Sequence, residues 1–156
     1  MKMHNKNVYL LTLYNANNIG AYLQTYSTLR LLNELGQETS LLKLKSNGST
    51  SRNSLKKYLK KMELFKLLFK YKSRKKYNNA QNIFHKVGID EIKKPATFIV
   101  GSDECWNLNS KSFYHHKEYF GVGLGNERVI SFCSCANSCP IELFYNQDYE
   151  IDFTRL

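Results

Sequence analysis

The fold expected for this 156-residue chain is decided by one stretch, Phe98-Ile99-Val100-Gly101-Ser102-Asp103-Glu104-Cys105-Trp106-Asn107. Its first three residues are apolar and β-prone and stop at a glycine, which predicts a short strand buried on both faces. The polar residues that follow predict a loop at the carboxyl end of that strand, where open parallel sheets bind ligands. A strand-to-helix turn capped by Asp103 explains the same residues without a ligand, so both interpretations stay open.

Further strands and a helix are predicted around this stretch. Residues 8–13, 39–44 and 129–133 have the composition of strands, and residues 19–35 have helical spacing and end at Gly36. The β-α-β opening predicts an α/β fold with a mostly parallel, Rossmann-like sheet flanked by helices. The helix carries a single apolar stripe, which consists of Ile19, Tyr22, Leu23, Tyr26, Leu29 and Leu32.

The net charge of +10 comes from one segment, which runs from Arg52 to Lys76. It contains eleven Lys or Arg and one acid, whereas the rest of the chain carries twelve basic and twelve acidic groups. The composition therefore predicts one neutral domain over residues 1–156 with a basic helical insert at about 52–86. An amphipathic helix of this kind is suited to anionic lipid and, less so, to nucleic acid. A solvated helix that packs on the domain is the simplest interpretation.

The sequence shows no targeting segment. The apolar run 8–13 has no small-residue cleavage site after it, and no apolar run approaches the ~20 residues that span a bilayer. A soluble, cytoplasmic location is expected by default, with peripheral contact at the inner face of the membrane if the insert binds lipid.

The cysteines do not predict a metal site. Cys133 and Cys135 fall in an apparent strand, and neither a C-x-x-C pair nor a correctly spaced histidine accompanies them. We therefore expect buried, reduced thiols, no bound metal and no cofactor.

A second polar loop follows the first strand and opens the first helix. Gly20 allows a ligand to approach the backbone, and a helix N-terminus offers N–H groups to an anion. Asn15, Asn18 and Gln24 add neutral hydrogen-bonding groups. The alternative is an Asn-rich turn with a capping asparagine. Loops that follow parallel strands open on one edge of the sheet, so we expect this loop to converge with residues 102–107.

Three motifs in this order resemble the polysaccharide pyruvyl transferase family. They are Asn18-Ile19-Gly20-Ala21-Tyr22-Leu23-Gln24-Thr25-Tyr26, the stretch 98–107, and Tyr119-Phe120 followed by Ile130-Ser131-Phe132. The resemblance covers residues 8–137 and implies one half of a GT-B-like architecture, in which two Rossmann-like domains face a cleft. It also implies transfer of a pyruvyl group from phosphoenolpyruvate to a sugar hydroxyl of a surface polysaccharide.

The candidate site residues follow from these loops. Asp103 and Glu104 are the catalytic candidates, as acid/base groups or as acceptors for sugar hydroxyls. The substrate-binding candidates are Asn15, Asn18, Gly20, Gln24, Ser102, Trp106, Asn107 and Ser131. The chain departs from the family pattern in two places. Glu104 stands where Gln is common, and residues 131–137 (Ser-Phe-Cys-Ser-Cys-Ala-Asn) stand where the family tends to have Ser-Tyr-Ala-Ala-Ser-Phe-Gly.

The resemblance covers the N-terminal domain of the family only, and no second domain is recognisable. Outside the basic insert the sequence shows no Lys or Arg cluster for the two anionic groups of phosphoenolpyruvate. We therefore expect the chain to be inactive alone, as a fragment, a truncated product or half of a split enzyme whose partner chain supplies the second domain. The alternatives are a glycosyltransferase domain that uses a nucleotide sugar and a non-catalytic module that binds the membrane surface.

Overall fold

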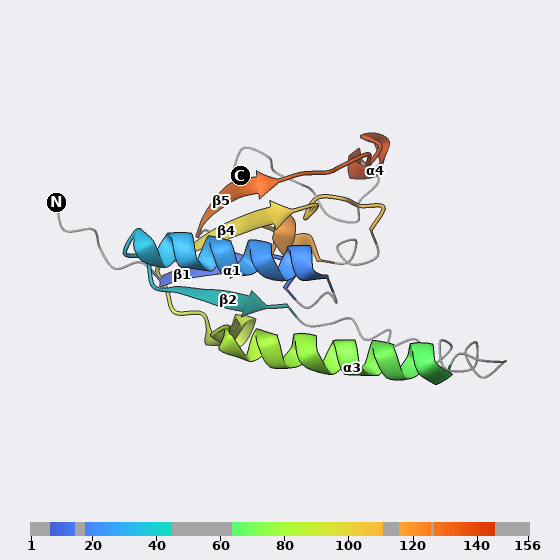
Figure 1. The fold of residues 1–156 in the computed structure, drawn as a ribbon. Coiled ribbons are helices and arrows are strands. Elements are labelled where there is room, and N and C mark those ends of the chain that lie inside the picture. The colour runs from blue at the N-terminus through green and yellow to red at the C-terminus, as the bar shows by residue number, and fades with distance from the viewer. Residues whose placement is uncertain (1–6, 15–17, 45–63, 111–115, 126, 146–156) are drawn as a thin grey trace.

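The computed structural model describes residues 7–14, 18–44, 64–110, 116–125 and 127–145, and these form a five-stranded sheet with helices on its faces (Figure 1). All the strand pairs are parallel, in the order β3-β2-β1-β4-β5. The strands are β1 (Asn7–Leu11), β2 (Thr39–Lys43), β3 (Lys86–Gly88), β4 (Ala96–Asp103) and β5 (Arg128–Ser134). The helices are α1 (Ile19–Glu34), α3 (Leu64–Ala80) and α4 (Glu142–Tyr145), with 3-10 turns η1 (Gln81–Ile83), η2 (Ile89–Glu91) and η3 (Lys117–Phe120). The predicted α/β class with a parallel sheet is confirmed.

Two elements differ from the sequence-based expectation. The short strand β3 was not expected, because Val87 is its only large apolar residue and so no apolar run marks it. Strand β4 continues to Asp103, past the glycine at which the apolar run stops. Gly101 has φ 125° and a Cβ there would lie 1.9 Å from the Phe132 carbonyl oxygen, so only glycine allows β5 this close. Of the predicted helical insert at about 52–86, residues 52–63 lie outside the described part, and α3 ends at Ala80.

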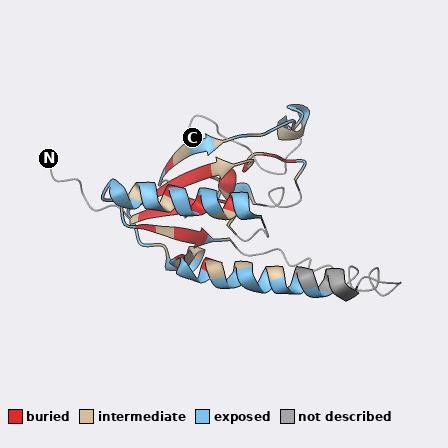
Figure 2. Cartoon of the chain, in the orientation of Figure 1, coloured by how far each residue is buried: buried red, intermediate tan, exposed pale blue. Residues whose placement is uncertain are grey.

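Alternating residues of the central strands fill two cores, one on each face of the sheet. Val8, Leu10 and Ile99 form the core beneath α1, with Leu29 and Leu32 of the helix packed on them. The opposite face carries the larger core, whose fully or nearly fully buried members include Leu11, Phe98, Val100, Tyr119 and Phe120. Figure 2 shows the buried residues concentrated in the central strands, while the outer sides of the helices are exposed. None of the described helices is long and apolar enough to cross a membrane.

Helix α1 packs on the sheet through small and hydroxyl side chains. Ala21, Thr25 and Thr28 are its buried residues, and the Thr25 hydroxyl donates to the Ala21 carbonyl oxygen at 2.8 Å. The predicted apolar stripe is split. Leu29 and Leu32 pack on the sheet, whereas Ile19, Leu23 and Tyr26 are 57%, 51% and 41% exposed. These three side chains lie away from the sheet because Ala21, Thr25 and Thr28 occupy the sheet-facing side of the helix.

The strand order reverses between β1 and β4. From β1 the chain passes through α1 to β2, and from β4 it passes through η3 to β5 on the other side of β1. Helix α1 packs on one core and η3 on the other, so the two connections leave the sheet towards opposite faces. The carboxyl ends of β1 and β4 are therefore a topological switch point, the position at which open α/β sheets bind ligands.

Candidate functional site

The two polar loops of the sequence both start at this switch point. Leu11 at the end of β1 pairs with Val100 of β4, so the residues that follow each strand leave the same edge of the sheet. Asn18 and Gly20 open α1, and residues 102–107 end β4 and continue past it. Asn15 lies outside the described residues, and its proposed role stays a prediction.

The loop before α1 contains the expected helix cap. The Asn18 side-chain oxygen accepts a hydrogen bond from the Gly20 backbone N–H at 2.8 Å, as N-cap asparagines do. Gly20 and Gln24 are exposed in the first turns of the helix. A side chain at position 20 would begin 3.2 Å from the capping oxygen, which explains the glycine locally. The capping interpretation of this loop is thus shown for Asn18, and a ligand role for Gly20 and Gln24 stays a prediction.

Ser102 and Asp103, at the end of β4, make hydrogen bonds to α1 and to the residues that follow β4 and β5. The hydroxyls of Ser102 and Thr28 share a hydrogen bond of 3.2 Å, which ties the end of β4 to α1. The Asp103 carbonyl oxygen accepts from the N–H groups of Cys105 and Cys135. Its carboxylate uses Oδ1 to accept the Glu104 N–H at 2.8 Å, and Oδ2 has no hydrogen-bond donor among the described residues. Among the described residues, Asp103 therefore has one carboxylate oxygen without a hydrogen-bond donor.

The Glu104 carboxylate is held by two side-chain amides. Asn107 donates to Oε2 and Asn137 donates to Oε1, each at 2.8 Å. These hydrogen bonds, the Asn107 bond first, lower the pKa of Glu104 below its ordinary value and favour the carboxylate form. Asn137 has φ 52°, a left-handed conformation that asparagine tolerates and that suits the glycine of the family pattern. The two departures from the pattern, Glu104 and Asn137, are thus in direct contact.

Trp106, Asn107 and Ser131 have structural partners. The Trp106 indole N–H donates to the Tyr119 carbonyl oxygen at 2.9 Å, and its ring stacks on Phe120. Asn107 is buried and, besides its bond to Glu104, accepts the N–H of Asn109. Ser131 pairs with Val100, which also pairs with Leu11 at the end of β1, so it lies level with the start of the two loops and three residues before the end of β5. A ligand role for these three residues stays a prediction.

Sequence reasoning missed Tyr14, which follows β1 at the same edge. Its carbonyl oxygen accepts the buried Gln81 amide at 2.7 Å, and the Lys86 ammonium nitrogen stands 5.2 Å from its ring centre. Burial raises the pKa of the Tyr14 phenol. Burial also raises the pKa of Tyr119, with weaker contributions first from Cys105 and then from Tyr14. A tyrosine at the end of an apolar run has no distinctive sequence signal.

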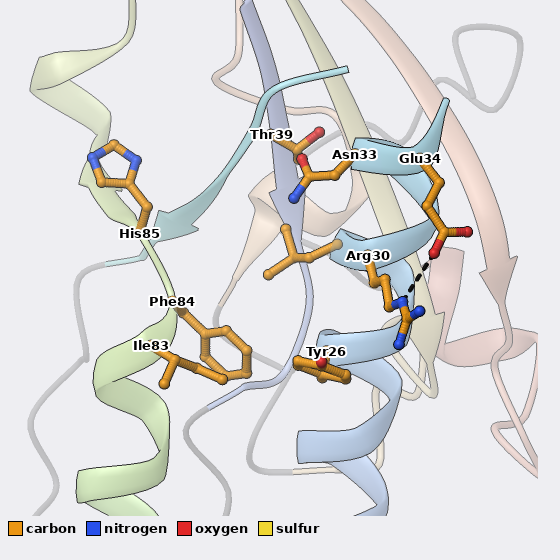
Figure 3. A pocket seen from close by; sticks show the side chains of 9 residues that line it. Tyr26, Arg30, Asn33, Glu34, Thr39, Ile83, Phe84 and His85 are labelled. Atoms are coloured by element: carbon orange, nitrogen blue, oxygen red, sulfur yellow. Dashed lines mark hydrogen bonds and ion pairs between the residues drawn. The ribbon is translucent and has the colours of Figure 1, made fainter. Parts of the chain in front are cut away.

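A hollow of about 550 Å³ lies elsewhere, between the second half of α1 and residues 83–85 (Figure 3). Thr39 at the start of β2 lines it, so it lies towards the amino-terminal edge of the sheet. Arg30 and Glu34 form an exposed ion pair of 2.9 Å at its rim. None of the residues predicted from the loops lines this hollow. The part of the chain that the structure describes holds no group of three or more His, Cys, Asp or Glu placed for a metal ion.

The fold and these loops define an α/β protein whose candidate ligand site is a Rossmann-type switch point. The family model for polysaccharide pyruvyl transferase matches residues 18–132, which include α1, β2, α3, β3, β4 and most of β5. The chain belongs to the polysaccharide pyruvyl transferase family. Comparison with the curated proteins and with the solved structures gave no match.

Proposed function

We propose that this chain takes part in the transfer of a pyruvyl group from phosphoenolpyruvate to a sugar hydroxyl of a surface polysaccharide. The family match over residues 18–132 carries the proposal. The position of Asp103 supports it, because this carboxylate ends β4 at the switch point and its Oδ2 has no hydrogen-bond donor among the described residues. The reaction consumes two hydroxyls of the sugar, forms a ketal at the central carbon of the donor and releases phosphate.

The two carboxylates are suited to different tasks. During transfer, a base takes the proton of the attacking hydroxyl, and an acid protonates the methylene carbon of the donor. We assign the base to Asp103, whose Oδ2 makes no hydrogen bond to the described residues. Glu104 is kept ionised by Asn107 and Asn137, so it is suited to accept a hydrogen bond from a sugar hydroxyl and unsuited to donate a proton.

We also propose that the site is completed by a second domain or partner chain. A transfer site must exclude water and align donor with acceptor. In this chain Gly20 and Gln24 are exposed, and the apolar side chains of Ile19 and Leu23 beside them are 57% and 51% exposed. A covering wall would bury these apolar side chains at the switch point.

The test follows phosphate release from phosphoenolpyruvate with a panel of glycan acceptors. Residues 1–156 are assayed alone and with a separately expressed C-terminal domain of the family. Turnover is expected only in the mixture, and Asp103→Asn should reduce it by about 10²-fold or more, while Asp90→Asn on η2 serves as the control. Turnover by residues 1–156 alone would contradict the proposal that a second domain completes the site. Full activity of Asp103→Asn would contradict the assignment of Asp103 as the base. Consumption of a nucleotide sugar instead would establish the glycosyltransferase alternative.

The membrane-surface alternative has one specific observation in its favour, the exposed side of α3. Leu68 and Tyr71 are 50% and 68% exposed, and Lys72 and Lys75 lie beside them on the same side of the helix. Figure 1 shows α3 extending past the carboxyl edge of the sheet. Apolar and basic side chains on one helix side suit anionic lipid.

Sedimentation with phosphatidylserine vesicles tests this alternative. The chain should bind them, Lys72→Glu with Lys75→Glu should abolish binding, and the control pair Lys93→Glu with Lys117→Glu should not. Equal losses in both pairs, or no binding by the unaltered chain, would overturn it.

A further inference from the structure

Two lysines that are far apart in the sequence stand on one face of neighbouring strands. In the parallel ladder between β2 and β3, Leu41 pairs with Lys86 and Lys43 pairs with Gly88. Residues two apart in a strand share a face, so Lys43 and Lys86 are diagonal neighbours, within reach of each other's long side chains. Leu41 also pairs with Leu10, which belongs to the core beneath α1, so both lysines are on the α1 face.

Tyr14 directs Lys86 towards the carboxyl edge of the sheet. The Lys86 ammonium nitrogen lies 5.2 Å from the centre of the Tyr14 ring, an attractive cation–π arrangement. Tyr14 itself is fixed by the amide of Gln81, a side chain that is 6% exposed. The ammonium of a strand residue is therefore held at the end of β1, beside the switch point.

The charges of these two lysines are not neutralised by the protein that the structure describes. No carboxylate among the described residues forms an ion pair with Lys43 or Lys86. Partial burial lowers the pKa of Lys86, and the positive charge of Lys43 lowers it further. Two ammonium groups held together without a counter-charge repel each other, and a bound anion relieves that repulsion.

We propose that Lys43 and Lys86, supported by Tyr14, form a seat for a phosphate group at the switch point. Two ammonium groups match the double negative charge of a phosphate monoester. The inference rests on the proposed function only for the source of the phosphate, which we take to be phosphoenolpyruvate. It places the donor on the β2 side of the switch point and leaves the β4 side, with Asp103, to the acceptor sugar. It also supplies two cations outside the charged segment Arg52–Lys76, which the sequence alone did not bring together.

The direct test is calorimetric titration of the full chain with inorganic phosphate and with phosphoenolpyruvate. The variant Lys43→Met with Lys86→Met keeps the aliphatic stems and removes both charges. The control Lys93→Met with Lys117→Met removes the same net charge elsewhere, from exposed positions. We expect the first pair to weaken binding of both probes at least tenfold and the control to change it less than twofold. Equal weakening in both pairs, unchanged affinity in the first pair, or no binding by the unaltered chain would each overturn the seat.

Binding and transfer measurements together distinguish a failure of this inference from a failure of the proposed function. If the probes bind through Lys43 and Lys86 but the completed site transfers no pyruvyl group, the seat stands and the proposed function fails. If transfer proceeds and the lysine pair leaves the KM for phosphoenolpyruvate unchanged, the seat fails and the function stands. Lysine-dependent binding of inorganic phosphate and uridine diphosphate glucose, without binding of phosphoenolpyruvate, would support the seat and assign it to a nucleotide-sugar donor.

Discussion

Asn137, after Asn107, lowers the pKa of Glu104, and a glycine at position 137 isolates the contribution of Asn137. Asn137→Gly keeps the backbone at φ 52° without strain and removes the amide that donates to Glu104 Oε1. We expect the pKa of Glu104 to rise towards its ordinary value, as measured by carbon-13 NMR of the carboxyl group.

The same variant should lose stability in a defined pH range. The folded-state pKa of Glu104 lies below its ordinary value of 4.5, so the hydrogen bonds stabilise the folded chain above that pH. The difference in unfolding free energy between the chain and Asn137→Gly should therefore be present at pH 7 and shrink as the pH falls below 4.5. In a Glu104→Gln background the pH dependence should disappear. An unchanged Glu104 pKa in Asn137→Gly would contradict the role of this contact.

The cysteines should differ in reactivity because their thiols differ in burial. Cys105 is fully buried, and burial raises its thiol pKa to about 12. The expectation of buried thiols is wrong for Cys133 and Cys135, which are exposed near the end of the edge strand β5. The thiolate is the reactive form, so iodoacetamide at pH 8 should modify Cys133 and Cys135 at least about tenfold faster than Cys105. Peptide mass spectrometry over a time course measures the three rates. Equal rates would show that the core around Cys105 opens readily.

At the scale of elements, the pairing of β4 with β5 depends on Gly101. A Cβ at this position would lie 1.9 Å from the Phe132 carbonyl oxygen and 2.9 Å from the Ser134 hydroxyl, with φ at 125°. Gly101→Ala should therefore cost about 3 kcal/mol or more of unfolding free energy in urea titrations. Gly36→Ala is the matched control, because its φ is 75° and no atom lies within 4 Å, so about 1–2 kcal/mol is expected. Equal costs would show that β5 can move away from β4.

The elements also show how far sequence reasoning reaches. The strands β1, β2, β4 and β5 were predictable because apolar runs mark buried parallel strands, and their common direction placed both polar loops at one edge. The core-facing side of α1 was not, because it buries the polar residues Thr25 and Thr28. Thr25 donates to a carbonyl oxygen of its own helix, and Thr28 meets Ser102 only in the folded sheet. The proximity of Lys43 and Lys86 could not be predicted from the sequence. Strand β3 has no apolar run that would mark it, and its register with β2 is set only when the sheet forms.

At the scale of the whole molecule, β5 is an exposed border of the sheet. Among the described residues it pairs with β4 alone, and its Phe132 side chain is 38% exposed. Strand edges with apolar side chains favour pairing between chains, and a lysine on the edge opposes it. We expect concentration-dependent association in sedimentation velocity runs, which Phe132→Lys should suppress. Tyr145→Lys, at an 80% exposed position on α4, should leave association unchanged, and an equal effect of both would point to net charge instead.

The central position of β1 in the sheet affects the order in which the chain folds. Val8 pairs on one side with Thr39 and on the other with Thr97. The hydrogen bonds between β1 and β4 therefore cannot form until residues much later in the chain have been synthesised. Local contacts can assemble β1, α1 and β2 early, but closure between β1 and β4 spans most of the chain and is entropically slow. Until it happens, one edge of the apolar strand β1 stays open. We expect this closure to limit the folding rate and to be the step at which newly made chains need a chaperone.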